Sequence, residues 1–488
     1  MKTKISYILI ALGILCTSCS DFLNVQPSDR ISEETNFTNI AGFKQAINGI
    51  YVELNSSDLY GRALTCEFIE IMAQRYAIDQ QNNKSDWETM QLNYSSSTPQ
   101  SRLQNIWSKG YNLIANCNLI IKNCEQHREV LPDEYYHLIK GEAYALRAYL
   151  HLDLFRLFGS VYDPEVSTLA IPYYTQLQLD VAPTPSAQEF MDLVLKDLKT
   201  AEEELQDDPI VTFGVNGDPK DIFLQFRNLR LNLYAVYGLL ARYYYYAHDN
   251  ENAYAYAKKV VDIQERHFPW VKLLSLTGSN IDHMFSTEIM FALQNLQRDN
   301  LFTSLFNGNS LKTSSLLAPL EDVTTEIFGG TMASSDYRVR SSLSGTVEQG
   351  GKKYVLFNKY QGTDSLYNQM IPMIRVSESF LILAETGPDD EERLSRFTEF
   401  NNARGLQGVE NIEELNTLFD DIDNSQYTEL GKEWIREFYG EGQLFFWYKR
   451  NQCLSMRSAT SATNDLPFRM LSASRYTPPI PEGEEKYN

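Results

Sequence analysis

Apolar residues recur at steps of three and four over two long segments of the chain, one on each side of residue 130. Each set forms one apolar stripe on a helix: Trp107, Tyr111, Ile114, Cys117, Ile121 and Cys124 in the first, and Ile139, Ala143, Leu146, Leu150, Leu154 and Leu157 in the second. Gly159 and Pro164 follow the second stripe and end its helix.

A third helix is predicted to begin near residue 186. Ser186 and Glu189 have the spacing of a capping box, in which each side chain bonds the other residue's backbone. The stripe that follows consists of Phe190, Val194, Leu198, Ala201 and Leu205.

Residues 233–263 predict two helices around the polar turn "HDNEN". The spacing is typical of a tetratricopeptide unit, whose small residues let two helices approach closely. The matching positions are Tyr237, Leu240, Ala241, Tyr244, Ala253, Ala257 and Val260. Residues 377–406 predict a second helix pair, and such pairs bury their faces against neighbouring pairs.

Residues 268–370 differ from both flanks, because Gly, Ser, Asn and Thr become frequent and the apolar runs shorten. We expect loops and a few short strands there. The folded chain is therefore divided into a helical region over 34–267, a loop-rich ligand-binding region over 268–370 and a second helical region over 371–488. Loops on a rigid frame are frequent binding sites.

The first residues are typical of an export signal: Lys2 and Lys4, then an apolar run over 5–15, then small residues. The run is too short to span a membrane. We predict a signal peptide over 1–18, with Cys19 as the first mature residue and the site of a lipid anchor, and a tether over 19–33. An ordinary cleavage that leaves Cys19 as a free thiol is the alternative.

Composition narrows the class of partner. The chain has 43 basic and 64 acidic residues, a formal charge of −21. Binding of nucleic acid needs a basic face, so we expect no nucleic-acid partner. The four remaining cysteines after the signal, at 66, 117, 124 and 453, are too sparse for a disulfide framework. Cys117 and Cys124 lie about 10 Å apart along one helix, beyond disulfide reach, so buried free thiols are expected.

Catalytic motifs are absent from the sequence. The six histidines form no pair at metal-ligand spacing, and we expect neither metal nor cofactor. Two carboxylates could serve glycoside cleavage: Glu437 and Glu441 would share a helix face if the helix continued through Gly440. That hypothesis makes the protein a glycoside hydrolase and is kept as a rival.

Aromatic residues in polar loops are the better candidates for binding. Trp87 and Tyr94 lie in the polar stretch 80–100, Phe302 and Phe306 in "QRDNLFTSLFNGN", and Tyr360 after "LFNK". An exposed ring beside Asn, Gln or Asp suits a sugar, because the ring stacks on its apolar face and the polar groups bond its hydroxyls.

Several segments in order resemble the SusD/RagB family of outer-membrane lipoproteins that serve glycan uptake. They are "CSDFLNVQPSD", "WSKGYNLIANCNLII", "GEAYALRAYLHLDLFRLFG", "DLKTAEEEL", "IRVSESFLILAE", "REFYGEG" and "PPIPEGE". After "EFYGEG" the family usually continues Arg-x-x-x-Asp-Leu, where this chain has Gln443, Phe446 and Trp447. The chain therefore resembles a divergent branch.

The resemblance implies a mainly α protein, a right-handed helical scaffold of about four tetratricopeptide-like pairs with long loops and a few short strands. It implies an oligosaccharide ligand and a SusC-like, TonB-dependent outer-membrane barrel as partner, with the protein at the cell surface and membrane contact only through the lipid. By region, it assigns Trp87, Asn93 and Tyr94 to one ligand-binding loop and Phe302, Phe306 and Tyr360 to others. The resulting hypothesis is a non-enzymatic glycan-binding protein; a peptide-binding uptake protein is a second rival.

Overall fold

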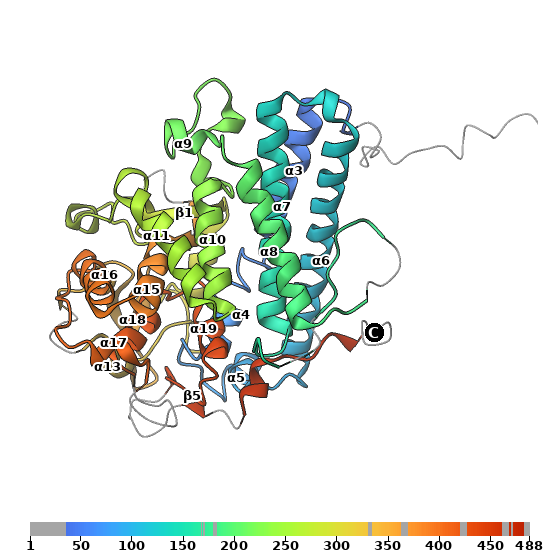
Figure 1. Cartoon of the computed structure of the whole chain (residues 1–488). Helices are drawn as coiled ribbons and strands as arrows, with labels where there is room; N and C mark the ends of the chain where they lie inside the picture. Colours follow the sequence, from blue (N-terminus) through green and yellow to red (C-terminus); the bar gives the residue numbers. More distant parts are fainter. Residues whose placement is uncertain are drawn as a thin grey trace, which may run out of the picture.

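The computed structural model describes residues 36–482 except 167, 169–170, 179–182, 330–333, 363–368, 420–426, 461–467 and 470–471. Helices dominate it (Figure 1). They are α3 (Ile40–Leu54), α4 (Phe68–Met72), α5 (Lys84–Met90), α6 (Ser97–Gln126), α7 (Asp133–Phe158), α8 (Ala187–Glu204), α9 (Pro209–Phe213), α10 (Leu233–Tyr246), α11 (Asn250–His267), α12 (Arg298–Leu305), α13 (Glu321–Phe328), α14 (Tyr337–Arg340), α15 (Val376–Thr386), α16 (Asp390–Ala403), α17 (Glu413–Asn416), α18 (Glu429–Glu437) and α19 (Leu444–Arg450).

Within the described residues, six short strands form three antiparallel pairs, β1 with β4, β2 with β3 and β5 with β6. They are β1 (Ile289–Gln294), β2 (Leu343–Gln349), β3 (Lys352–Phe357), β4 (Met370–Arg375), β5 (Ser455–Met456) and β6 (Phe468–Arg469). The strands β1 to β3 and the helices α12 to α14 fall between residues 268 and 370, so the expected loops and short strands are observed, with three short helices among them.

The helices stack in chain order. α6 packs on α7, α7 on α8, α8 on α10, α10 on α11, α11 on α15 and α15 on α16, as the view from α6 to α16 shows (Figure 1). Ala241, Ala253 and Ala257 are fully buried where α10 and α11 meet, as the tetratricopeptide spacing predicted. The predicted mainly helical scaffold is confirmed.

Local signals placed the helix starts correctly. The Ser186 hydroxyl accepts a hydrogen bond from the Glu189 backbone N–H, and the Glu189 carboxylate accepts one from the Ser186 N–H, which is the predicted capping box of α8. The polar stretch 80–100 is more ordered than its composition suggests. It contains α5, capped by the Asn83 side chain, and the first turn of α6.

The interior holds the thiols, as predicted, and the imidazole of His151 as well. Cys66, Cys117, Cys124 and Cys453 are free and buried. His151 is fully buried with its ring stacked on Tyr173 at 3.7 Å between centroids, and burial lowers its pKa well below the usual value. It is therefore a neutral packing residue.

Gln443, Phe446 and Trp447, at which the sequence departs from the SusD/RagB pattern, are also buried. The Arg156 guanidinium donates to the Gln443 side-chain oxygen at 3.1 Å and lies 4.1 Å from the centre of the Phe446 ring. The Trp447 ring stacks on Trp434 with centroids 6.0 Å apart. The departure therefore changes the packing of the interior in this region.

Five charged side chains form a network at the junction of the loop-rich region and the C-terminal helices. Arg404 donates to Glu437 at 2.6 and 2.8 Å and to Glu288 at 2.7 and 3.0 Å. Arg375 donates to Glu437 at 2.6 Å and to Glu441 at 2.9 Å. Arg404, Glu288 and Glu437 have no exposed side-chain surface, so their charges are balanced by protein groups alone, which for Glu437 include Arg375 and Arg338.

This network predicts the result of the substitution Arg404→Met. Removing the guanidinium leaves two buried carboxylates with too few cations, so the free energy of unfolding should fall by about 3–5 kcal/mol. Urea denaturation followed by far-UV circular dichroism measures the change.

Arg396→Met is the matched control. Arg396 lies on the outer side of α16 and pairs with Glu392 and Glu399 at 2.9 and 3.0 Å, with 22% of its side chain exposed. An exposed pair of this kind contributes at most about 1 kcal/mol. Equal losses for the two variants would contradict the role assigned to the network.

Candidate ligand-binding site

The two loop regions predicted to bind ligand lie next to each other. The Ala77 N–H donates to the Ala318 carbonyl at 2.9 Å, and the Val355 N–H donates to the Pro319 carbonyl at 3.0 Å. The segment that leads into α5 is therefore joined through residues 318–319 to β3. The N-terminal and mid-chain loop regions are therefore linked through buried backbone contacts.

Trp87 lies on α5 in this region and is half-buried. The helix begins because the Asn83 side chain accepts from the Asp86 N–H at 3.3 Å and also donates to the Asp86 carboxylate at 2.6 Å. The ring packs in part against the main core and keeps part of its surface in solvent. A ring held in this way can stack on a sugar without first being ordered.

Asn93 and Tyr94 follow α5 in a turn. Asn93 is exposed, and its amide donates to the Ser96 hydroxyl at 2.8 Å. Tyr94 is half-buried, and its hydroxyl donates to the Arg475 carbonyl at 2.7 Å. The Tyr94 ring therefore helps to fix the turn, while Asn93 is the more accessible of the two.

Arg475 fixes the turn after α5, a contact that the sequence did not predict. It lies in a short 3-10 helix, Ala473–Tyr476, and its guanidinium donates to the Gln91 carbonyl at 2.5 Å. With the Tyr94 contact, this makes two hydrogen bonds between the C-terminal segment and the turn after α5. No local pattern could have revealed a contact between residues more than 380 positions apart.

Phe302 lies on α12 and is half-buried, with exposed Thr303 and Ser304 beside it. Phe306 and Tyr360 lie elsewhere than predicted: 1% of the Phe306 side chain and none of the Tyr360 side chain is exposed. The expectation that these two rings face solvent is wrong.

The cause is a buried aromatic cluster. The Phe306 and Tyr360 rings lie nearly parallel with centroids 6.0 Å apart, and both contact Phe357. Tyr76 and Tyr439 join from distant segments, and the Tyr360 hydroxyl donates to the Gly440 carbonyl at 2.7 Å. The rings that keep solvent exposure among the predicted ones are Trp87, Tyr94 and Phe302.

Glu437 and Glu441 do not form a catalytic pair. α18 ends at Glu437, and Gly440 and Gly442 take positive φ values of 75° and 70°, so no helix continues to Glu441. Glu441 is paired with Lys359 at 2.5 Å and with Arg375 at 2.8 Å. Both carboxylates are occupied by cations.

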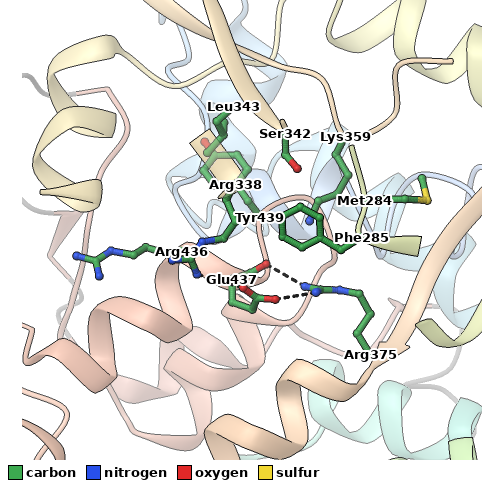
Figure 2. A pocket seen from close by; sticks show the side chains of 10 residues that line it. All are labelled: Met284, Phe285, Arg338, Ser342, Leu343, Lys359, Arg375, Arg436, Glu437 and Tyr439. Carbon is green, nitrogen blue, oxygen red and sulfur yellow. Dashed lines mark hydrogen bonds and ion pairs between the residues drawn. The ribbon is translucent and has the colours of Figure 1, made fainter. Parts of the chain in front are cut away.

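The cavity beside Glu437 has a volume of about 10 Å³, enough for about one water molecule. Figure 2 shows Glu437 at its edge, joined to Arg375 by the dashed contacts, with Arg338 and Tyr439 nearby. Burial raises the pKa of Glu437, but Arg404 and Arg375 lower it by more, so the pKa lies well below its usual range. An enclosed, ionised carboxylate cannot protonate a leaving group.

Glu70 lies next to this network and has the opposite shift. It is fully buried and accepts hydrogen bonds from the Gly440 and Gly442 N–H groups, both at 2.9 Å. Burial raises its pKa to about 7, and Arg75 and the two N–H groups offset only part of that shift. Glu70 therefore holds the 440–442 turn and takes up a proton near neutral pH.

No three His, Cys, Asp or Glu side chains among the described residues are grouped closely enough to hold a metal ion. Nor is any described helix both long enough and apolar enough to cross a membrane.

Comparison with known proteins supports the resemblance seen in the sequence. Residues 21–216 match a SusD-like family described as starch-binding and associating with the outer membrane. SusD-like protein P38 of Formosa agariphila is 32% identical over 206 residues, which cover 41% of this chain and 36% of P38. The match thus spans about a third of that relative's length.

Two solved structures share the fold over nearly the whole chain. A SusD superfamily protein from Bacteroides thetaiotaomicron has a TM-score of 0.69 at 20% identity, covering 92% of this chain and 98% of that one. A SusD-like carbohydrate-binding protein from Bacteroides vulgatus has a TM-score of 0.67 at 18% identity, covering 92% and 96%. The resemblance to the SusD/RagB family is confirmed, and the structural neighbours establish the fold.

The raised pKa of Glu70 predicts a pH dependence of stability. The folded carboxyl has a pKa of about 7 and the unfolded one about 4.5, so the folded state binds the extra proton between these values. The contribution of Glu70 should therefore fall as the pH rises from 4.5 to 7, by up to about 3 kcal/mol.

Comparison with Glu70→Gln isolates this effect, because the variant cannot titrate at position 70. Urea unfolding of both proteins at pH 4.5, 5.5, 6.5 and 7.5 gives the difference in free energy. The free energy of unfolding of wild type should fall progressively relative to that of the variant as the pH rises. A difference that stays constant across the series would show that Glu70 does not titrate in this range.

Proposed function

Because the chain is similar to SusD-like proteins in its first 216 residues and shares their fold, we propose that it is a non-enzymatic carbohydrate-binding lipoprotein of the cell surface. It captures an oligosaccharide and passes it to a SusC-like, TonB-dependent outer-membrane barrel. The observation that carries the proposal is the pre-formed surface around Trp87: a ring held on α5, next to exposed Asn93, on a turn clamped by the C-terminal segment.

The chemistry of this surface suits a sugar. Stacking on an aromatic ring contributes roughly 1 kcal/mol beyond buried area, and the Asn93 amide offers both a donor and an acceptor for hydroxyl groups. Phe302, on α12 in the mid-chain region, is the candidate for a second stacking ring. Few contacts of this strength give weak binding, which suffices when a barrel beneath raises the effective concentration.

The charge state of the carboxylates supports a role in binding without turnover. Glycoside cleavage needs one carboxyl group of raised pKa and a second carboxylate across the sugar. Glu437 is held by Arg375 and Arg404 and borders a space of water size, and Glu441 is held by Lys359 and Arg375. Glu70 has the raised pKa but no exposed surface.

The lipid anchor is proposed from the sequence alone. Cys19, the signal peptide over 1–18 and the tether over 19–33 lie outside the described residues. The division of the folded chain into three regions, with boundaries after residues 267 and 370, is likewise a proposal. In it, the ligand contacts lie on the loops between the two helical regions and on the segment around α5.

Trp87→Ala tests the site. Loss of one stacking ring should weaken binding of a soluble glycan about five-fold or more, since 1 kcal/mol is about a five-fold change in Kd. Affinity electrophoresis against a panel of soluble polysaccharides that includes starch, followed by calorimetry with the best ligand, measures the change. The melting temperature should stay nearly unchanged, because the ring is only half-buried.

Phe213→Ala is the matched control. Phe213 lies on α9, has half of its side chain exposed and belongs to neither predicted loop region. The Phe213→Ala variant should bind the glycan as tightly as wild type. If Trp87→Ala lowers the melting temperature by many degrees, Trp87 is a core residue and the assigned site is wrong. Heat of binding with peptides and none with any glycan would favour the peptide-binding rival.

Cys19→Ala tests the anchor. A protein that is lipidated at Cys19 should fractionate with the outer membrane, and the variant should move to the soluble fraction or stay unprocessed. Immunoblots of membrane and soluble fractions, with metabolic labelling by an alkyne palmitate, distinguish these states. Unchanged labelling of the variant would place the lipid elsewhere.

A further inference from the structure

Gln74 directly follows Ala73, the C-terminal cap of α4, and has a backbone conformation that favours glycine, with a φ of 64° in the left-handed region. The Gln74 N–H donates to the Ile71 carbonyl at 3.1 Å, and the N–H of the next residue donates to the Glu70 carbonyl at 3.0 Å. These two bonds form a Schellman motif, whose left-handed residue is usually glycine because a side chain there is strained. A buried glutamine at this position therefore calls for a contact that offsets the strain.

The Gln74 side chain makes such a contact with α5. α4 and α5 pack against each other (Figure 1). The amide nitrogen Nε2 of Gln74 donates to the Met90 carbonyl, in the last turn of α5, at 2.6 Å, and lies 3.5 Å from the Met72 carbonyl in α4. A glycine at position 74 would relieve the strain but would lose this contact.

The contact completes the C-terminal end of α5. The last four carbonyl groups of a helix have no hydrogen-bond partner inside it. Three of those four in α5 accept from the backbone N–H groups of residues 91–93, and the fourth, that of Met90, accepts from Gln74. The Met90 side chain is also buried in the main core. The last turn of α5 is therefore held at one residue through both its side chain and its carbonyl.

This turn carries the Trp87 ring. Of the seven residues of α5, only Thr89 and Met90 are buried, so the helix has few other contacts that fix it. Trp87 precedes Met90 by three positions, so the two lie next to each other on the helix surface. A shift of the last turn would therefore move the ring. Arg475 bonds the residue after the helix, whereas Gln74 bonds the helix itself.

We propose that Gln74 is a positioning residue of the ligand site. It keeps a strained backbone conformation so that its amide can hold the last turn of α5 and, through that turn, the Trp87 ring. The inference rests on the proposed function and deepens it, because it adds a buried residue that acts on the ligand only through Trp87.

Gln74→Met tests the positioning without any ligand. The substitution keeps the volume of the side chain but removes the amide donor. Fluorine-19 NMR of the full-length protein labelled with 5-fluorotryptophan gives one resonance for each of the five tryptophans, and Trp87→Phe identifies that of Trp87. This resonance should shift or split in Gln74→Met, while that of Trp270, on the segment after α11, stays unchanged.

Gln74→Gly and His248→Gly form a matched pair that separates strain from contact. His248 occupies the same position in a Schellman motif after α10, with a φ of 61°, but its side chain is exposed. Glycine at position 248 should raise the melting temperature and leave the Trp87 resonance in place. Glycine at position 74 relieves the same strain, which favours folding of this variant, but should still shift the Trp87 resonance. A Trp87 resonance that is unchanged in both Gln74 variants would overturn the proposal.

Glycan binding shows whether Gln74 acts through the ring. Soluble starch, xyloglucan, arabinoxylan and laminarin are the probes in affinity electrophoresis. With a polysaccharide that wild type binds, Gln74→Met should raise the Kd at least about three-fold, up to the roughly five-fold loss expected of Trp87→Ala. In the Trp87→Ala background the same substitution should have no further effect on the Kd, because residues that act through one another are not additive.

Two results in this cycle contradict the inference: an unchanged Kd for Gln74→Met, or an equal loss of affinity with and without the Trp87 ring. The NMR measurement keeps the inference separate from the function on which it rests. If wild type binds none of the four polysaccharides but the Trp87 resonance moves in both Gln74 variants, the proposed ligand fails and the positioning role of Gln74 stands.

Discussion

The pairing of Arg404 and Arg375 with Glu437 is the constraint on which the central part of this fold is built. A charge without solvent contact is tolerable only when its partners surround it, and Glu437 meets this condition by accepting from the guanidinium groups of Arg338, Arg375 and Arg404, which lie on three separate elements. The arginines in turn bond Glu288 and Glu441. The loop-rich region, β4, the end of α16 and the turn after α18 can therefore take only one arrangement, in which every charge in the network has a counter-charge.

The candidate site uses the same principle on a smaller scale. α5 is a helix of seven residues and could not be stable alone. It is held by its Asn83 cap and by the two hydrogen bonds between the following turn and Arg475. A short helix fixed in this way presents Trp87 in one position, which reduces the ordering entropy that a weakly bound sugar would otherwise have to offset.

The sequence allowed the helical scaffold to be predicted because its signals are local. The apolar stripes, the capping box at Ser186 and the small residues at Ala241 and Ala257 each require only neighbouring residues to be read. Phe306 and Tyr360 show the limit. Both lie in polar loops, but their partners Tyr76 and Tyr439 come from segments far away in the chain, and these contacts decide that the rings are buried. The role of Arg475 and the buried charge network were unpredictable for the same reason, since position in sequence does not say which distant carboxylate a guanidinium will meet.

The contact between Arg475 and the turn after α5 means that the candidate site can be completed only after the C-terminal segment has folded. The residues that form the candidate site come early in the chain, but the segment that fixes them comes almost last. Because a chain is synthesised from its N-terminus, the turn after α5 is locked only once residue 475 has been made. A chain cut short before Ala473–Tyr476 would therefore carry Trp87 without the contact that fixes the turn after α5.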